Sequence, residues 1–269
     1  MYRSWRHHGR SFDLGRMTLS DLFAAYRTHP AVHVYLLGAL VSLAVAIRES
    51  SGPWRPILAV LATAAAYPLA WYLLHRFVLH AKFLYRSPLT ASLWKRIHFD
   101  HHQDPYRMDV LFGSPVTTLP TILVILIPLG WVVGGGAGGA AAAVCAGLLI
   151  TCAYEFCHCV QHLNFKPRNR LLRRMKELHL AHHFHDEVGN YGITSFVIDR
   201  LFGTYYASAR ERKRSPHVFN LGYDASEATR FPWVARLSGG PPLDRPPSGN
   251  APAGKASAGD AAMRRRETA

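Results

Sequence analysis

Cysteine is scarce in this 269-residue chain, and its four thiols form neither a metal-binding nor a disulfide pattern. All four lie within or just after one apolar segment, and no two of them are separated by two residues: Cys145, Cys152, Cys157 and Cys159. A zinc knuckle needs closely paired cysteines, and a disulfide framework is typical of small secreted domains. We therefore expect reduced, packed thiols, and any metal site must be built from other residues.

Acidic residues are also few, with 17 Asp and Glu against 31 Lys and Arg, which gives a net charge of +14. Such a charge can attract nucleic acid, but no nucleic-acid recognition motif accompanies it. The basic residues instead flank long apolar segments, where anionic lipid headgroups are the simpler partner. We therefore expect no nucleic-acid partner.

Four long segments contain no charged residue at all: 31–47, 56–74, 110–133 and 137–154. At about 1.5 Å of helical rise per residue, each is long enough to cross the hydrocarbon core of a bilayer. Uncharged runs of this length are rare in water-soluble folds. The sequence therefore predicts an all-α integral membrane bundle of four transmembrane helices.

Basic residues are distributed unevenly around these four segments. Arginines precede the first segment, further basic residues lie between the second and the third, and a basic run at 166–176 follows the fourth. The hairpin on the opposite side between the first two segments carries only Arg48 and Arg55. Because cytoplasmic loops are enriched in Lys and Arg, we expect a multi-pass protein with its basic side and both termini in the cytoplasm.

Ten of the sixteen histidines fall in four clusters, all at the basic ends of the apolar segments. The clusters are His75 and His80 in HRFVLH; His98, His101 and His102 in HFDHH; His158 and His162 in HCVQH; and His179, His182 and His183 in HLAHH. Neutral imidazole suits iron, zinc, copper and nickel. Ten imidazoles are too many for one ion, so the inventory predicts two metals with four or five nitrogens each.

Helical spacing indicates how the imidazoles converge within a cluster. Residues three or four apart share a helix face, so both HxxHH motifs and the HxxxH motif each present their histidines together. His75 and His80 are five apart and diverge by about 140° on an ideal α-helix. This pair must either serve different metals or straddle a helix end.

In order and spacing, the four clusters resemble those of the fatty acid hydroxylase and sterol desaturase superfamily of membrane di-metal enzymes. The resemblance covers about residues 75–206, including NYGITSFVIDRLFGTYY after the last cluster, and is strongest to the fatty acid 2-hydroxylase branch. It implies that all ten histidines hold two non-haem iron ions in a cytoplasmic helical cap, with zinc an alternative in isolated protein. It also implies O2-dependent hydroxylation of an unactivated C–H bond in a lipid, a fatty acyl chain in the favoured case.

Composition along the chain, together with the resemblance, suggests a domain organisation: a basic N-terminal cytoplasmic arm at 1–30, a transmembrane and catalytic hydroxylase-like domain at 31–206, and a tail at 207–269. A cap helix is expected from Asn169 to His183. The tail is basic at first and becomes rich in Pro, Gly, Ala and Ser after Gly239, a composition typical of disorder.

Several residues near the clusters are candidates for supporting roles. Asp100 and Glu155 could accept hydrogen bonds from ligand imidazoles, with solvated or ion-paired states as the alternative. His185, just after the last cluster, is a further candidate. Aromatic residues next to the ligands could line a path for lipid or could anchor the helices at the interface: Trp71, Tyr72, Tyr154 and Phe156.

Other functions remain open on the sequence. A sterol desaturase or carotenoid hydroxylase would share the metal ligands, although carotenoid hydroxylases commonly have a wider third motif. A membrane metal storage or transport protein would place ligands along a transmembrane path, and the first and third apolar segments contain almost none. No stretch resembles a cytochrome b5, flavin or ferredoxin domain, so we expect electrons from an external cytochrome b5- or ferredoxin-type donor.

Overall fold

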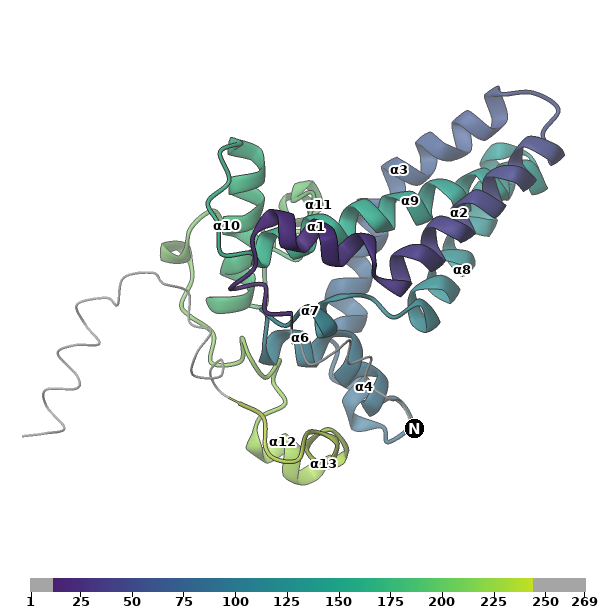
Figure 1. Ribbon diagram of the computed structural model, residues 1–269. Coiled ribbons are helices and arrows are strands. Elements are labelled where there is room, and N and C mark those ends of the chain that lie inside the picture. The colour runs from purple at the N-terminus through teal and green to yellow at the C-terminus, as the bar shows by residue number, and fades with distance from the viewer. Residues whose placement is uncertain (1–11, 244–269) are drawn as a thin grey trace, which may run out of the picture.

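The computed structural model describes residues 12–243, and within this range the chain is all-helical. The only β-type pairing there is one isolated bridge between Asp13 and Arg107. Four long helices form an elongated bundle, and the shorter helices gather at one end of it (Figure 1). The predicted fold class is therefore confirmed.

The bundle consists of α2 (Pro30–Glu49), α3 (Trp54–Leu74), α8 (Pro115–Gly134) and α9 (Ala137–His162). Each is long and apolar enough to span a membrane, as the sequence predicts. Large apolar side chains such as Leu40, Val124 and Val132 point outward, where lipid would cover them. These features are those of an integral membrane bundle.

Helix α9 is the central helix of the bundle, since it packs against α2, α3 and α8 and is the most buried of the four. Its first half is mostly Gly and Ala, and small residues let helix backbones approach closely in a membrane. The approach is tightest between Gly134 and Gly139: a Cβ built on Gly139 would lie 2.3 Å from the Gly134 Cα. This packing fixes the start of α9 in the bundle, and the opposite end of the same helix carries His158 and His162.

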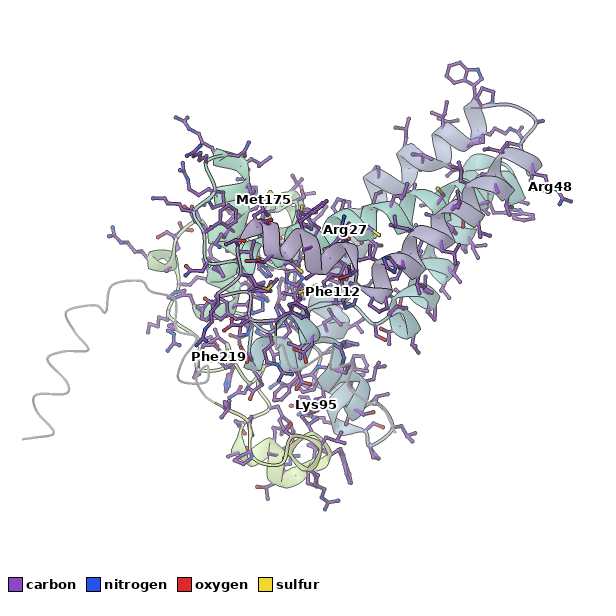
Figure 2. All side chains as sticks on the ribbon, viewed as in Figure 1. Arg27, Arg48, Lys95, Phe112, Met175 and Phe219 are labelled. Carbon is purple, nitrogen blue, oxygen red and sulfur yellow. The ribbon has the colours of Figure 1, made fainter. Side chains whose placement is uncertain are left out.

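The cap is formed by three stretches of chain. Helix α1 (Leu19–Arg27) precedes the bundle. Between α3 and α8 lie the π-helix η1 (His75–Leu79), α4 (Phe83–Arg86), α5 (Ala91–Trp94), the π-helix η2 (Lys95–Phe99), α6 (Asp100–Gln103) and α7 (Met108–Leu111). After α9 come α10 (Arg170–Phe184), α11 (Val197–Leu201), η3 (Ala209–Glu211), α12 (Ala225–Arg230) and α13 (Trp233–Ser238). In Figure 2, Lys95, Met175 and Phe219 lie in this cap, and Arg48 lies at the opposite end of the bundle.

The expected cap helix is present as α10. Its N-cap is Asn169, whose side-chain oxygen accepts a hydrogen bond from Leu172 N at 3.0 Å. Capping of this kind satisfies one of the free backbone N–H groups at a helix start. The prediction of a helix from Asn169 to His183 is therefore confirmed to within one residue at each end.

The tail expected from residue 207 differs from the structure, because the folded chain continues to Leu243. Val218, Phe219, Tyr223 and Val234 are buried, and Leu221, Tyr223 and Val234 join the aromatic cluster around Trp94. The apolar residues here are short and irregularly spaced, so they give no periodic signal among the basic residues. The expectations for residues 1–11 and for the Pro-, Gly- and Ala-rich stretch after Leu243 lie outside the described residues.

An ion-pair network fastens this C-terminal segment to the cap. Glu227 on α12 accepts hydrogen bonds from Tyr85 OH at 2.7 Å and from Arg86, and it also pairs with Arg230. Gln103 on α6 donates to Phe219 O and accepts from Leu243 N. The Gln103 hydrogen bonds bring Phe219 and Leu243 against the histidine-bearing helix α6.

The Gly134–Gly139 contact predicts a sensitive position in the bundle. In Gly139→Ala, the new methyl group meets backbone atoms that can move only if α8 and α9 separate, and overpacking of this kind costs about 1–3 kcal/mol. We expect a lower melting temperature in detergent. Gly52→Ala is the matched control, because nothing lies within 4 Å of a Cβ there. Equal melting temperatures for the two variants would contradict this account of the bundle.

Candidate metal centre

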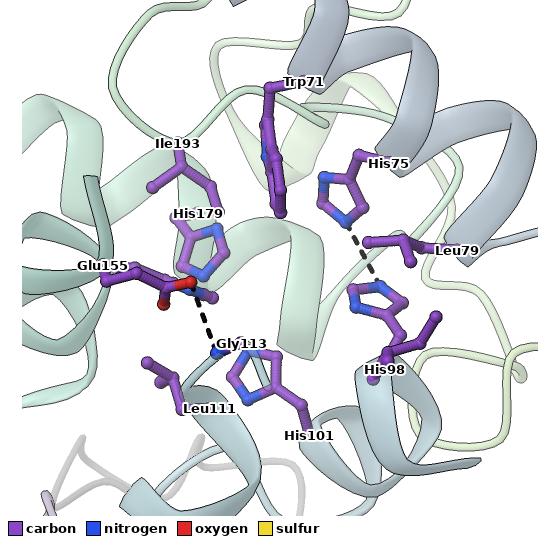
Figure 3. A pocket seen from close by; sticks show the side chains of 12 residues that line it. Trp71, His75, Leu79, His98, His101, Leu111, Gly113, Glu155, His179 and Ile193 are labelled. Carbon is purple, nitrogen blue, oxygen red and sulfur yellow. Dashed lines mark hydrogen bonds between the residues drawn. The ribbon is translucent and has the colours of Figure 1, made fainter. Parts of the chain in front are cut away.

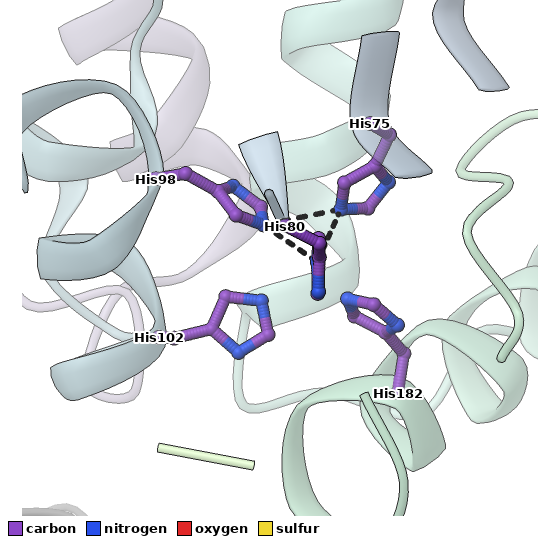
Figure 4. Close-up of side chains that lie close together, drawn as sticks. All are labelled: His75, His80, His98, His102 and His182. Carbon is purple, nitrogen blue, oxygen red and sulfur yellow. Dashed lines mark hydrogen bonds between the residues drawn. The ribbon is translucent and has the colours of Figure 1, made fainter. Parts of the chain in front are cut away.

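The ten clustered histidines converge in the cap as two groups of five. The potential ligand atoms within each group all lie within 4.8 Å of one another. The first histidine group contains His75, His80, His98, His102 and His182, and the second histidine group contains His101, His158, His162, His179 and His183. Figure 4 shows the five rings of the first histidine group pointing toward a common centre.

The two HxxHH motifs divide their histidines between the groups. His98 and His102 belong to the first histidine group, whereas His101 between them belongs to the second. The division is reversed on α10, where His179 and His183 belong to the second histidine group and His182 to the first. Residues at i and i+4 point one way on a helix, and the adjacent i+3 residue points about 100° from i+4. Helices α6 and α10 therefore each contribute to both groups. The prediction that the histidines of each HxxHH motif share one face is wrong.

A π-helix resolves the five-residue spacing of His75 and His80. Residues 75–79 form η1, and His80 N donates a hydrogen bond to His75 O at 3.1 Å. In a π-helix the i→i+5 hydrogen bond places residues five apart above one another. Both imidazoles therefore enter the same group, so the pair does not serve different metals. His80 is the C-cap of η1, so the pair straddles a helix end, which was the second alternative.

Nine of the ten imidazoles are buried, and only His80 is partly exposed. Burial disfavours the charged form, and it lowers the pKa of the cap histidines His98, His101, His102, His179 and His183 well below the usual value. For His182 burial lowers the pKa to about 4. Neighbouring imidazoles add to the effect at most of these rings. The rings are therefore neutral near pH 7, the state in which imidazole binds metal.

Backbone carbonyls orient three rings of the first histidine group. His75 Nδ1 lies 2.6 Å from Tyr191 O, His102 Nδ1 lies 2.7 Å from Val218 O, and His182 Nδ1 lies 2.7 Å from Gly189 O. A carbonyl oxygen can only accept, so each Nδ1 carries the hydrogen. The lone pair of each ring is thus on Nε2, which faces the centre of the group.

The arrangement of these lone pairs fits a cation. The Nε2 atoms of His75, His80 and His98 lie 2.9–3.2 Å apart. Two nitrogens bound at right angles to one metal, with bonds of about 2.1 Å, would lie about 3 Å apart. In the second histidine group, buried ring nitrogens of His101, His158 and His183 have no hydrogen-bond partner among the described residues. Buried polar atoms normally have partners, and a metal ion in each group would supply them.

A small cavity lies between the histidines and the membrane helices. Its volume is about 40 Å³, which is room for only a few waters, and Trp71, Leu79, Leu111, Glu155 and Ile193 line it together with ligand rings (Figure 3). Glu155 lies on α9 one turn before His158, and its Oε1 accepts a hydrogen bond from Gly113 N at 3.3 Å. Its other oxygen is buried without a partner among the described residues.

The candidate supporting residues occupy different places. Asp100 forms an ion pair with Lys95 at 2.6 Å, and His185 Nε2 lies 2.8 Å from Arg212 O, outside both groups. Glu155 lines the cavity. Three ligand rings are instead oriented by backbone carbonyls, which a pattern of side chains in the sequence cannot predict. The residues within 190–206 that could have indicated this arrangement are Asn190 and Asp199, whose side chains hydrogen-bond to the backbone of this stretch.

The four aromatic residues also differ in position. Trp71 lines the cavity and packs against Tyr154, with ring centroids 4.5 Å apart. Tyr72 instead hydrogen-bonds Thr204 at 3.1 Å and stacks on Phe202. Phe156 packs against Tyr26 on α1. Of the four, only Trp71 directly lines the cavity.

The fold and the site together define a multi-helix membrane protein with a candidate metal site of two all-histidine groups. The sequence model of the fatty acid hydroxylase family matches residues 60–204, which is more than half of the chain. The chain therefore belongs to the fatty acid hydroxylase family.

Three curated relatives illustrate the similarity. The ceramide very long chain fatty acid hydroxylase SCS7 of Saccharomyces cerevisiae is 32% identical over 146 residues, covering 52% of this chain and 35% of that protein. The dihydroceramide fatty acyl 2-hydroxylase FAH2 of Arabidopsis thaliana is 28% identical over 185 residues, covering 65% and 73%. Human fatty acid 2-hydroxylase is 27% identical over 208 residues, covering 76% and 49%. The chain thus spans only about a third of the yeast relative's length.

One solved structure shares the fold. Full-length Scs7p, in which only the hydroxylase domain is visible, matches with a TM-score of 0.52 and 23% identity, covering 75% of this chain and 71% of that one. The similarity supports the arrangement of bundle and cap.

The division of the HxxHH motifs predicts which histidines act together. His101→Ala and His102→Ala should each lower bound metal by up to one equivalent per chain, because each removes a ligand from a different group. Combining His101→Ala with His179→Ala should cause no further loss, since both belong to the second histidine group. Combining His101→Ala with His102→Ala should affect both metals. Elemental analysis of purified protein measures this, with exposed His33→Ala as the control.

Proposed function

We propose that this protein is a membrane-bound di-iron oxygenase that hydroxylates an unactivated C–H bond of a lipid, with a fatty acyl chain as substrate. The observation that carries the proposal is the pair of buried five-histidine groups beside a cavity that faces the membrane helices. The relatives named above support the acyl substrate, because their names describe ceramide and fatty acyl hydroxylases.

The ligand set favours oxygen chemistry over hydrolysis. Hydrolytic zinc sites usually have three protein ligands and an open position for water. Here each group has five neutral nitrogens and, among residues 12–243, no carboxylate or thiolate. Two iron ions held this way would be strongly cationic and would supply the reduction of O2. The overall reaction consumes O2, two electrons and two protons, inserts one oxygen into the C–H bond and releases water.

The surrounding residues have defined tasks in this proposal. Carbonyls of Gly189, Tyr191 and Val218 hold three imidazoles with Nε2 toward the centre of the first histidine group, where a metal would bind. Trp71, Leu79, Leu111 and Ile193 exclude bulk water from the cavity. Because the cavity holds only a few waters, an acyl chain requires some of these side chains to move. Trp71, on α3 at the membrane side, is the largest of them.

Sidedness and the electron donor follow from charge. We propose that the cap, the histidine groups and both chain ends face the cytoplasm, because basic residues flank the spans on that side. We further propose that electrons come from a cytochrome b5- or ferredoxin-type partner that docks on the cap.

Lipid analysis tests the activity. Expression in a host without hydroxylated lipids should yield lipids that gain one oxygen by mass spectrometry, and the gain should disappear in His182→Ala. A loss of two hydrogens would instead identify a desaturase, and an oxygenated isoprenoid would identify a carotenoid hydroxylase. Unchanged lipids in a protein that retains its metals and receives electrons would favour storage, and would refute the proposal.

Glu155 provides a second test, because an ionisable group that lies inside a membrane span and is not a ligand is a functional candidate. Its unpartnered oxygen is available to a polar group of the substrate or to cavity water. We expect Glu155→Gln to lower turnover about tenfold, as loss of one hydrogen bond to a charged group would, with metal content unchanged. Exposed Glu177→Gln on α10 should retain full turnover. Normal turnover in both variants would exclude a role for Glu155.

A further inference from the structure

The two histidine groups have different surroundings, and we propose that they bind metal unequally: the first histidine group is the high-affinity site and is filled before the second. Asp199 is the positioning residue that makes this difference. The inference rests on the proposed function only in requiring that both groups bind metal.

The first histidine group is oriented before any metal arrives. Three of its five rings donate Nδ1–H to backbone carbonyls, at 2.6–2.7 Å. Hydrogen bonds of this kind fix the tautomer and the ring orientation of a metal ligand, and their loss typically costs 10–100-fold in metal affinity. The ion therefore meets lone pairs that already face it.

The second histidine group lacks this support within the described part of the chain. The Nδ1 atoms of His101, His162, His179 and His183 are buried without hydrogen-bond partners. Binding at Nε2 must then select the tautomer and fix each ring, and it leaves Nδ1–H groups buried and unsatisfied. Both costs reduce the affinity of the second histidine group relative to the first.

Two of the three orienting carbonyls belong to one rigid loop, residues 189–192. The Asp199 carboxylate is fully buried and accepts hydrogen bonds from Tyr191 N at 2.8 Å, Gly192 N at 2.9 Å and Thr204 Oγ1 at 2.8 Å. Asn190, at φ 53°, exchanges two hydrogen bonds with the Tyr206 backbone. Asp199 thus aims Tyr191 O at His75 without touching any ligand ring itself.

Access favours the same order of filling. His80 in the first histidine group is partly exposed, whereas all five rings of the second are buried. Partial exposure of His80 gives an ion a point of access to the first histidine group that no ring of the second offers.

Titration of the full-length apoprotein in detergent with Co²⁺ under anaerobic conditions tests the proposal, with visible absorption as the readout. His179→Ala and His182→Ala form a matched pair on α10, because each leaves the other group's five ligands intact. This comparison removes the repulsion between two bound ions. We expect the intact first histidine group, present in His179→Ala, to bind Co²⁺ at least tenfold more tightly than the intact second histidine group in His182→Ala.

Asp199→Asn tests the positioning role. The amide cannot accept all the hydrogen bonds that the carboxylate does, so the loop loosens. In the His179→Ala background it should weaken Co²⁺ binding 10–100-fold, whereas in the His182→Ala background binding should be unchanged. Asp109→Asn, at an exposed ion pair with Arg107, is the control for lost charge.

The outcomes separate this proposal from the proposed function. Equal affinities in the two single variants, or tighter binding by the second histidine group, would overturn unequal binding. Equal weakening of both groups by Asp199→Asn would overturn its positioning role. If Asp199→Asn does not fold, the paired histidine variants still decide the main point. Wild-type protein that binds no Co²⁺ at either group would refute the metal centre and with it the proposed function.

Discussion

The constraint on which this structure depends is the burial of ten neutral imidazoles whose lone pairs face one another. In each group the lone pairs of buried nitrogens face one another at short distance, which is unfavourable without a cation. A metal ion bound at the centre would replace this repulsion with attraction. The rest of the cap can be understood as the framework that keeps these rings buried, neutral and aimed inward. Residues 218–243, which pack against α5 and α6, belong to that framework as much as the ligand helices do.

The bundle and the cap make different contributions. Helix α9 holds His158 and His162 at a fixed position along the bundle axis, because its small residues pack it closely against α3 and α8. Two π-helices, η1 and η2, adjust the direction of the chain where it leaves and approaches the first histidine group. Extra turns of this kind recur at functional sites. Here η1 converts a five-residue spacing into one shared direction.

The two histidine groups are mechanically coupled, because each HxxHH motif contributes ligands to both of them. Since α6 and α10 each contribute to both, neither group can shift without moving a ligand of the other. The distance between the two proposed ions is therefore set by two rigid helices rather than by a flexible loop. Such rigidity suits the proposed reaction, in which two metals would act on one O2 molecule. The hydrogen bonds of Asp199 make the loop at 189–192 rigid as well.

Much of this protein could be read from its sequence. Charge-free segments predicted four spans because the bilayer imposes a length and a composition that few soluble helices meet. The number of clustered histidines predicted two metals, because ten imidazoles are too many for one ion. Only the tertiary structure decided which imidazoles gather in one group, since adjacent histidines point to different centres and a π-helix brings His75 and His80 to the same centre. It alone decided that carbonyls of Gly189, Tyr191 and Val218 orient the first histidine group, because every residue has a carbonyl and only the fold determines where it points.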